Sequence, residues 1–312
     1  MSYKKADTNS IQMEKIEKIR GLNVAVVTPM TQEEVINLDV IPQYAGFLIN
    51  QGIDGVFVNG SSGEGLLLSV EERMAVLERW MEFSDKLNIL VHVGHTSYVE
   101  ARKLASHADR LGVRAISAMG PCFMQPKTME DFIGYNKIIA SAAPNTPFYY
   151  YHVPGYCGVN YPMDKFLEQA SLEIPTLSGM KYTSQDVWTE FNCVKVQGGR
   201  FDILHGHDET LVVGLQLGEH GGIGTSFNVY GKVFKQIIRL YESGNIQAAV
   251  DLQYEADKIV RLMCKYDAIL GTIKQMLVIL GIPVGPARLP NRNLTDAEKG
   301  DLRTEMSKYF NL

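Results

Sequence analysis

The sequence predicts an α/β protein, a (β/α)8 TIM barrel with a C-terminal helical extension, and three observations support this prediction. Eight short apolar runs alternate with helix-length segments at intervals of about 20–35 residues, the spacing of βα units in a parallel barrel. The runs are mostly continuous rather than alternating in polarity, as in strands covered on both faces. The first run leads into VVTPMTQEE, which lacks the G-x-G-x-x-G pattern expected of a doubly wound open sheet, the competing architecture.

The predicted strands are the apolar, β-branched or aromatic runs of this alternation. They cover residues 22–28, 53–60, 88–94, 113–120, 146–154, 174–182, 201–207 and 221–227. Between the second and third strands, residues 69–87 show helical periodicity and begin with a capping box, because Glu72 follows Ser69 by three positions. Residues 98–112 show the same periodicity and predict the next helix.

The alternation ends at about residue 229, and the rest of the chain is typical of consecutive helices. The first of them would close the barrel as its eighth helix. We therefore expect an N-terminal leader over residues 1–20, the barrel over 21–243, and a helical extension over 244–312 that packs on the barrel.

Composition excludes several classes of protein. The 312 residues are 46% hydrophobic and 21% charged with a net charge of −5, which disfavours a nucleic-acid surface. The cysteines are scattered without a C-x-x-C pair, which suggests a reducing compartment and no zinc ribbon; they are Cys122, Cys157, Cys193 and Cys264. The N-terminus has no apolar signal core, and no apolar run reaches the roughly 18 residues of a membrane span. We expect a cytoplasmic protein without a membrane partner.

Side chains at the ends of the predicted strands are the candidates for chemistry, because barrel active sites lie at the carboxyl ends of the strands. The second strand ends in NGSSGEG, where glycines expose backbone N–H groups and Ser61 and Ser62 add hydroxyl donors. Such a loop suits an anion such as a carboxylate. A plain βα turn is the alternative interpretation.

The fifth strand ends in YYYHVP, whose side chains alternate between two faces. Tyr149 and Tyr151 share one face, and Tyr150 and His152 share the other. A tyrosine inside the barrel mouth can donate or accept a proton, whereas aromatic filling of the core is the alternative.

The sixth strand ends at Lys181, in the run PTLSGMKYTS. Burial disfavours the charged form of an amine, and a neutral amine can attack a ketone to form a Schiff base. The alternative is that the strand ends one residue earlier and Lys181 points to water.

Histidines near the ends of the third and seventh strands invite a metal interpretation. His92, His95, His205 and His207 would be the ligands of a metal-dependent barrel hydrolase. Neither histidine pair lies on the first strand, where such hydrolases place one, so we expect no metal.

Two further strand ends carry groups that suit a polyol. After the seventh strand, the carboxylates of Asp208 and Glu209 can accept hydrogen bonds from hydroxyls, although Asp208 could instead be a helix N-cap. The eighth strand ends in GGIGTSFN, a glycine-lined segment that suits either phosphate or sugar hydroxyls.

Together these stretches resemble the N-acetylneuraminate lyase and dihydrodipicolinate synthase family of class I aldolases. The likeness covers nearly all of the chain beyond residue 20, and its motifs follow in order: AVVTP, NGSSGEG, YYYHVP, GMKYTSQD, HGHDE, GGIGTSFN and GIPVGPARLP. Within the family, YYYHVP and GPARLP are most similar to animal-type sialic acid lyases. Each motif is weak alone, but the combination is specific.

The resemblance implies roles for individual residues. Lys181 falls on the Schiff-base lysine, Tyr151 on the proton-relay tyrosine, and Ser61 and Ser62 on the pair that holds the pyruvate carboxylate. The positions implied to contact the glycerol-like tail and the sugar hydroxyls are Thr183, Gly206, Asp208, Glu209 and Thr225. The implied reaction cleaves N-acetylneuraminate to N-acetylmannosamine and pyruvate in a homotetramer, with a covalent lysine–pyruvate intermediate and no metal or organic cofactor.

Three positions depart from the family pattern. Tyr156 stands where dihydrodipicolinate synthases carry an arginine and sialic acid lyases an aliphatic residue, and Thr225 stands where serine is commoner. Phe123 replaces a tyrosine that many relatives use in proton relay. A lyase or dehydratase for another 2-keto-3-deoxy sugar acid is therefore an alternative. A non-catalytic pyruvate-binding relative fits less well, because Lys181 and Tyr151 are intact.

Overall fold

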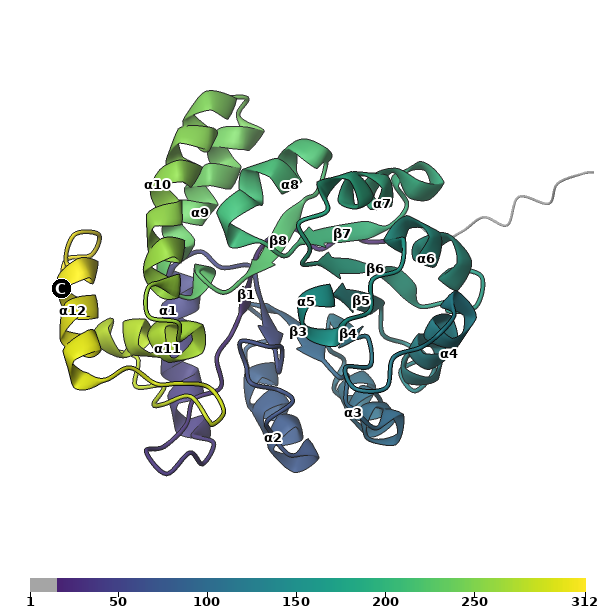
Figure 1. Ribbon diagram of the computed structural model, residues 1–312, viewed down its shortest axis with the longest axis horizontal. Coiled ribbons are helices and arrows are strands. Elements are labelled where there is room, and N and C mark those ends of the chain that lie inside the picture. Colours follow the sequence, from purple (N-terminus) through teal and green to yellow (C-terminus); the bar gives the residue numbers. More distant parts are fainter. Residues whose placement is uncertain (1–15) are drawn as a thin grey trace, which may run out of the picture.

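The computed structural model describes residues 16–312, so most of the predicted leader lies outside the described residues. Eight parallel strands close into a barrel in chain order, from β1 round to β8, which confirms the predicted fold class (Figure 1). The strands are β1 Gly21–Ala25, β2 Gly55–Val58, β3 Asn88–His92, β4 Ala115–Met119, β5 Phe148–His152, β6 Leu177–Tyr182, β7 Asp202–His205 and β8 Gly221–Gly224.

Helices surround the barrel and cover the outer face of the sheet (Figure 1). They are α1 Ile41–Asn50, α2 Val70–Met81, α3 Tyr98–Leu111, α4 Met129–Ala140, α6 Met163–Ala170, α7 Val187–Gly199, α8 Leu211–Leu217 and α9 Phe227–Glu242. Three shorter turns of helix lie in the connections: η1 Leu38–Val40, α5 Pro154–Cys157 and η2 Asp208–Thr210. None of the helices within residues 16–312 is both long and apolar enough to cross a membrane.

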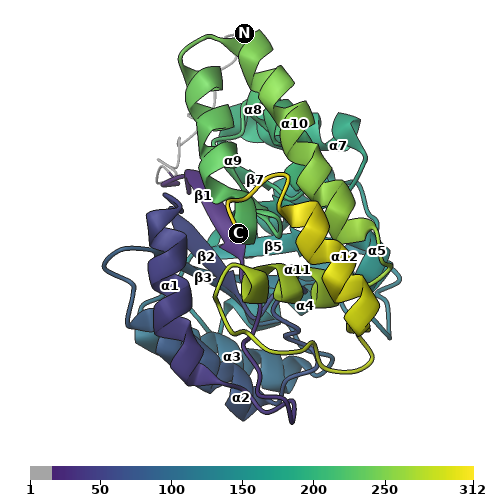
Figure 2. The same cartoon turned by 90° about the vertical axis from the view of Figure 1, so that its left-hand side faces the viewer.

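The helical extension consists of α10 Ile246–Cys264, α11 Ile269–Ile279 and α12 Asp296–Met306. Helices α10 and α11 pack against α9, and α12 packs against α11. Figures 1 and 2 show the three grouped on one side of the barrel. The expected limits of leader, barrel and extension at residues 20 and 243 stay a prediction.

The predicted elements overlap the observed ones, and their boundaries differ for physical reasons. The capping box at the start of α2 is present, with Ser69 accepting from the backbone of Glu72 and the Glu72 carboxylate accepting from the backbone of Ser69. The predicted strand 22–28 runs beyond β1 because Val26, Val27 and Thr28 are buried although they lie in the following loop. The predicted strand is therefore longer than β1 because burial continues past the last residue of β1.

Two apolar layers follow from side-chain alternation along the strands. One layer fills the barrel and includes Tyr149 and Tyr151; the other lies between sheet and helices and includes Tyr150. The predicted division of the faces of β5 is therefore confirmed. His152 belongs to the outer side, where its ring packs against that of Tyr182 with a centroid separation of 4.9 Å and an angle of 38° between the ring planes.

The lower end of the barrel, where the strands begin, is closed by a buried hydrogen-bonded group. Asp202 Oδ2 accepts from the backbone N–H of Ile19 at 2.7 Å and from the Tyr149 hydroxyl at 2.9 Å. Oδ1 of Asp202 has no partner among the described residues. Burial raises the pKa of Asp202 to about 6, although these hydrogen bonds oppose the shift.

Candidate active site

Lys181 and Tyr151 lie side by side at the upper end of the barrel. They are direct partners in the register of β6 and β5, so both side chains point into the barrel. The Lys181 side chain is buried, with its residue 4% exposed. Its Nζ lies 4.3 Å from the ring centroid of Tyr151 and 4.7 Å from that of Phe57. The prediction that Lys181 faces the interior rather than water is confirmed.

The partners of Lys181 are aromatic faces rather than acids. Within the described residues, no carboxylate lies in ion-pair range of its Nζ. A π-face stabilises an ammonium less than a salt bridge does, and an aromatic environment keeps water away. The arrangement leaves the Lys181 amine free of an acid partner and within reach of a carbonyl carbon held in the barrel mouth.

Two hydrogen-bonded pairs of hydroxyls lie at the same end of the barrel as this amine. The Tyr151 hydroxyl and Ser61 Oγ share a hydrogen bond of 3.0 Å, and Ser62 Oγ shares one of 2.7 Å with Thr225 Oγ1. These groups come from β5, the loop after β2 and the segment after β8, so closure of the barrel brings them together. Hydroxyls that can both donate and accept suit a carboxylate ligand and the relay of a proton.

The loop that carries Ser61 and Ser62 is held from below by residues of the barrel. Asn59 and Glu64 have φ angles of 58° and 56°, which bend the chain sharply at both ends of the serine pair. Thr28 Oγ1 donates to the carbonyl of Gly63 at 2.6 Å, and the Asn59 amide donates to the carbonyl of Arg73 at 2.9 Å. The serine hydroxyls are thus fixed before any ligand arrives.

The same loop is held from the other side by the C-terminal extension. Lys274 Nζ of α11 lies 2.6 Å from Glu64 Oε1, and both side chains are buried. Lys274 also donates to the carbonyl of Pro286, and the backbone N–H of Arg288 donates to Glu64 Oε2. Burial lowers the pKa of Lys274, and the Glu64 carboxylate opposes the shift. This pair is absent from the residues predicted from sequence, although Lys274 interrupts an apolar helix as Lys181 interrupts an apolar strand.

A cavity of about 760 Å³ opens at this end of the barrel, and every residue predicted to act on substrate lines it. These residues are Lys181, Tyr151, Ser61, Ser62, Thr183, Gly206, Asp208, Glu209 and Thr225. The cavity is large enough for a sugar acid. Their roles stay predictions, but the structure places them around one space.

Acidic groups after β7 form one wall of the cavity. The Asp208 carboxylate accepts from the backbone N–H of Ser226 at 2.5 Å, so it binds the N-cap residue of α9. The alternative that Asp208 is itself a helix N-cap is wrong, since His207 precedes the helical turn and no side chain caps it. Burial raises the pKa of Asp208, whereas the hydrogen bond from His207 lowers that of Glu209.

Further lining residues come from the extension and were missed by sequence reasoning. Met263 of α10, Asp267 and the segment Pro290–Arg292 border the cavity. They lie far along the chain from the strand ends, and no local pattern marks them. Of the residues that depart from the family pattern, Tyr156 and Thr225 line the cavity, whereas Phe123 is 82% exposed and is not among the lining residues.

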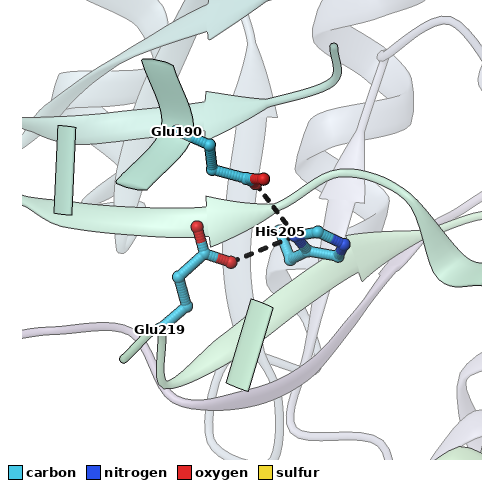
Figure 3. Close-up of side chains that lie close together, drawn as sticks. All are labelled: Glu190, His205 and Glu219. Carbon is cyan, nitrogen blue, oxygen red and sulfur yellow. Dashed lines mark hydrogen bonds and ion pairs between the residues drawn. The ribbon is translucent and has the colours of Figure 1, made fainter. Parts of the chain in front are cut away.

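The four histidines of the metal interpretation do not gather. His92 is buried beneath Arg73, which donates to its carbonyl at 2.5 Å, and burial lowers the pKa of His92 well below its usual value. His205 is not among the residues that line the cavity. Its ring points toward Glu190 and Glu219 (Figure 3). Burial alone would lower the pKa of His205, but hydrogen bonds to these carboxylates raise it to about 10. The hydrolase interpretation has no shared ligand set of histidines within the described residues.

Comparison with known proteins agrees with this geometry. Residues 18–309 match the Dihydrodipicolinate synthetase family. The chain is 36% identical over 297 residues to N-acetylneuraminate lyase of Homo sapiens, covering 92% of this chain and 93% of the relative. It is 37% identical to that of Xenopus tropicalis, covering 94% and 97%.

Solved structures give the same result. N-acetylneuraminate lyase of Aliivibrio salmonicida superposes with a TM-score of 0.90 at 36% identity, covering 94% of this chain and 97% of that one. The enzyme of Proteus mirabilis gives 0.89 at 35% identity, covering 94% and 99%. The chain therefore belongs to the dihydrodipicolinate synthetase family, and it is a lyase of the class I aldolase type.

Proposed function

We propose that the protein cleaves N-acetylneuraminate to N-acetylmannosamine and pyruvate through a Schiff base on Lys181. The observation that carries the proposal is the buried Lys181 amine, which contacts the Tyr151 ring and has hydroxyl donors close by. Relatives more than one-third identical are named N-acetylneuraminate lyases. A sialic acid aldolase of Ruminococcus gnavus, 28% identical, is described as having a catalytic lysine.

The reaction begins with attack of the neutral Lys181 amine on the C2 ketone of the open-chain sugar acid. Loss of water gives an iminium, which draws electrons from the C3–C4 bond. As the bond breaks, Tyr151 takes the proton of the C4 hydroxyl while its own proton passes along the hydrogen bond to Ser61, whose hydroxyl gives its proton to the substrate carboxylate. N-acetylmannosamine leaves as an aldehyde. The remaining enamine is protonated at C3, and water then releases pyruvate and restores the amine.

The substrate carboxylate and hydroxyls have separate places in this proposal. Ser61 and Ser62 would hold the carboxylate, because their hydroxyls and the adjacent backbone converge beside Lys181. The hydroxyl-bearing tail would lie along Thr183, Gly206 and Glu209. A carboxylate such as Glu209, kept charged by its bond to His207, accepts hydrogen bonds from sugar hydroxyls.

A second substrate class is favoured by Tyr156. Its side chain is 68% exposed and its residue lines the cavity, where sialic acid lyases carry an aliphatic residue. The alternative is a lyase or dehydratase for a 2-keto-3-deoxy sugar acid without the N-acetyl group. Comparing kcat/KM for N-acetylneuraminate and for 2-keto-3-deoxygluconate separates the two.

Borohydride trapping tests the Schiff base directly. Reduction in the presence of pyruvate is expected to inactivate the protein and to add one pyruvate-derived group to the peptide that contains Lys181, as read by mass spectrometry. Activity is expected to survive a chelator. A modification on any other lysine, or no modification, would contradict the proposal. The predicted homotetramer and cytoplasmic location stay predictions, and sedimentation analysis checks the first.

A further inference from the structure

A second cluster of ionisable side chains lies outside the cavity, on the helix side of the sheet. Glu190 of α7, His205 of β7 and Glu219, which follows α8, converge there (Figure 3). Their side chains are 2%, 3% and 0% exposed. None of the three lines the cavity. The proposed aldolase reaction gives this cluster no role.

The cluster has more acceptors than donors. Both carboxylates approach the same ring atom: His205 Nδ1 lies 2.9 Å from Glu190 Oε1 and 3.1 Å from Glu219 Oε2. One N–H cannot donate fully to both. Among the described residues, neither oxygen of Glu219 has a hydrogen-bond partner of good geometry. Glu219 is therefore a buried carboxylate, directed at His205, without a donor of its own, and such groups are costly.

The cluster holds two carboxylates and one imidazole. Within residues 16–312, His205 is the only cationic group in ion-pair range of Glu190 or Glu219. A divalent cation beside a neutral imidazole would neutralise both carboxylates, whereas protons shared within the cluster are the alternative that the experiment below separates from it.

The separations suit metal coordination. Ligands bound to zinc at about 2.0–2.2 Å lie roughly 2.9–3.5 Å apart at ordinary bond angles, which matches the distances from Nδ1. His205 Nε2 lies 3.0 Å from Thr210 Oγ1, so it can donate its N–H there and leave the Nδ1 lone pair for a metal. Gly214 lets the backbone approach the cluster closely, because a Cβ there would lie 2.5 Å from Glu219 Oε2 and 2.7 Å from the His205 ring.

We propose that Glu190, His205 and Glu219 bind one divalent transition-metal ion of the zinc class, which ties α7, β7 and the segment after α8 together. The imidazole nitrogen favours zinc-class ions over magnesium and calcium, which prefer oxygen ligands. The site holds the strand that leads into the cavity wall at Asp208 and Glu209. Its role is structural, and the proposal does not depend on the substrate of the cavity.

Equilibrium dialysis of the full-length, chelator-treated protein against Zn²⁺ and Co²⁺ tests the site, with bound metal counted by mass spectrometry. We expect one ion per chain, a rise in Tm on binding, and a Co²⁺ absorption spectrum of nitrogen and oxygen ligation without thiolate bands. The Glu219→Gln substitution keeps the shape of the side chain but removes its charge, so it should abolish this binding.

Two further variants keep the result interpretable. Thr210→Val removes only the acceptor for Nε2–H and should weaken metal affinity about 10–100-fold, even if Glu219→Gln folds poorly. Glu78→Gln is the matched control: Glu78 bonds to His107 at 2.8 Å without a second carboxylate, so metal binding should not change. The proposal is overturned if wild-type protein binds no more metal than Glu219→Gln, which would mean that the cluster holds protons alone. Borohydride trapping with pyruvate would still succeed in that case.

Discussion

The two ends of the barrel interior use the same kind of side chain for different purposes. Tyr149 and Tyr151 lie two positions apart on β5, and both are buried inside the barrel. The Tyr149 hydroxyl at the lower end donates to Asp202, a contact between two protein groups that no ligand can reach. The Tyr151 hydroxyl at the upper end meets Ser61 and borders the cavity. The position of a tyrosine along β5 thus decides its role: the hydroxyl of Tyr149 stabilises the lower end of the barrel, and that of Tyr151 is available to a substrate.

Removing the Lys181 amine should have the largest effect and should act on the upper end alone. Lys181→Ala is expected to reduce turnover to background, because no other amine can form the intermediate. Stability should hardly change, since Lys181 contacts aromatic rings and forms no ion pair among the described residues. Steady-state kinetics and thermal unfolding measure both quantities. If Lys181→Ala still turns over substrate, Lys181 is not the amine that forms the intermediate.

Removing the upper phenol should give the next largest effect. Tyr151→Phe is expected to slow turnover about 10²–10⁴-fold, the usual contribution of a positioned acid or base. Borohydride trapping of pyruvate on Lys181 should persist, because formation of the adduct needs the amine first. Equal losses of trapping and turnover would show that the phenol mainly positions Lys181 instead of moving protons.

The lower end of the barrel should make the free energy of unfolding depend on pH. The folded pKa of Asp202, about 6, lies above its ordinary 3.8, so the folded chain binds this proton more tightly than the unfolded chain does. Its contribution to stability is therefore complete below about pH 4 and is lost as pH rises through about 6, by up to about 3 kcal/mol. Urea unfolding across this pH window should show that the free energy of unfolding changes less with pH in Asp202→Asn than in wild type. Parallel profiles would contradict the assignment.

Removing the lower phenol should have the smallest effect. Tyr149→Phe deprives buried Asp202 of a donor and should cost about 1–3 kcal/mol of unfolding free energy. Because Tyr149 lies away from the cavity, kcat should stay within a factor of about two of wild type. It is the matched control for Tyr151→Phe, and a large loss of activity would show that the two ends are coupled.

Local patterns predicted the parts of this molecule that depend on local physics. The apolar run around Lys181 indicated a buried strand, and alternation placed Tyr149 and Tyr151 on one face; both are confirmed. The direction of His205 needed more, because it depends on the register in which Leu204 lies beside Lys181 and His205 beside Tyr182. Sequence alone cannot supply that register, so it could not show that His205 points toward Glu190 and Glu219.

Long-range partners could not be predicted for the same reason. Glu64 and Lys274 are separated by most of the chain, and only packing of α11 against the barrel mouth brings them together. The resemblance gave Phe123 a position equivalent to a relay tyrosine, but the structure exposes its side chain outside the cavity lining.

The Glu64–Lys274 ion pair has a consequence for attempts to redesign this enzyme. Deleting α11, or exchanging it for a helix without the lysine, would leave the buried Glu64 carboxylate without its counter-ion in the loop that carries Ser61 and Ser62. Such chimaeras should lose affinity for pyruvate before they lose the barrel itself. A design that replaces the C-terminal helical extension should therefore keep both Glu64 and Lys274, or replace both together.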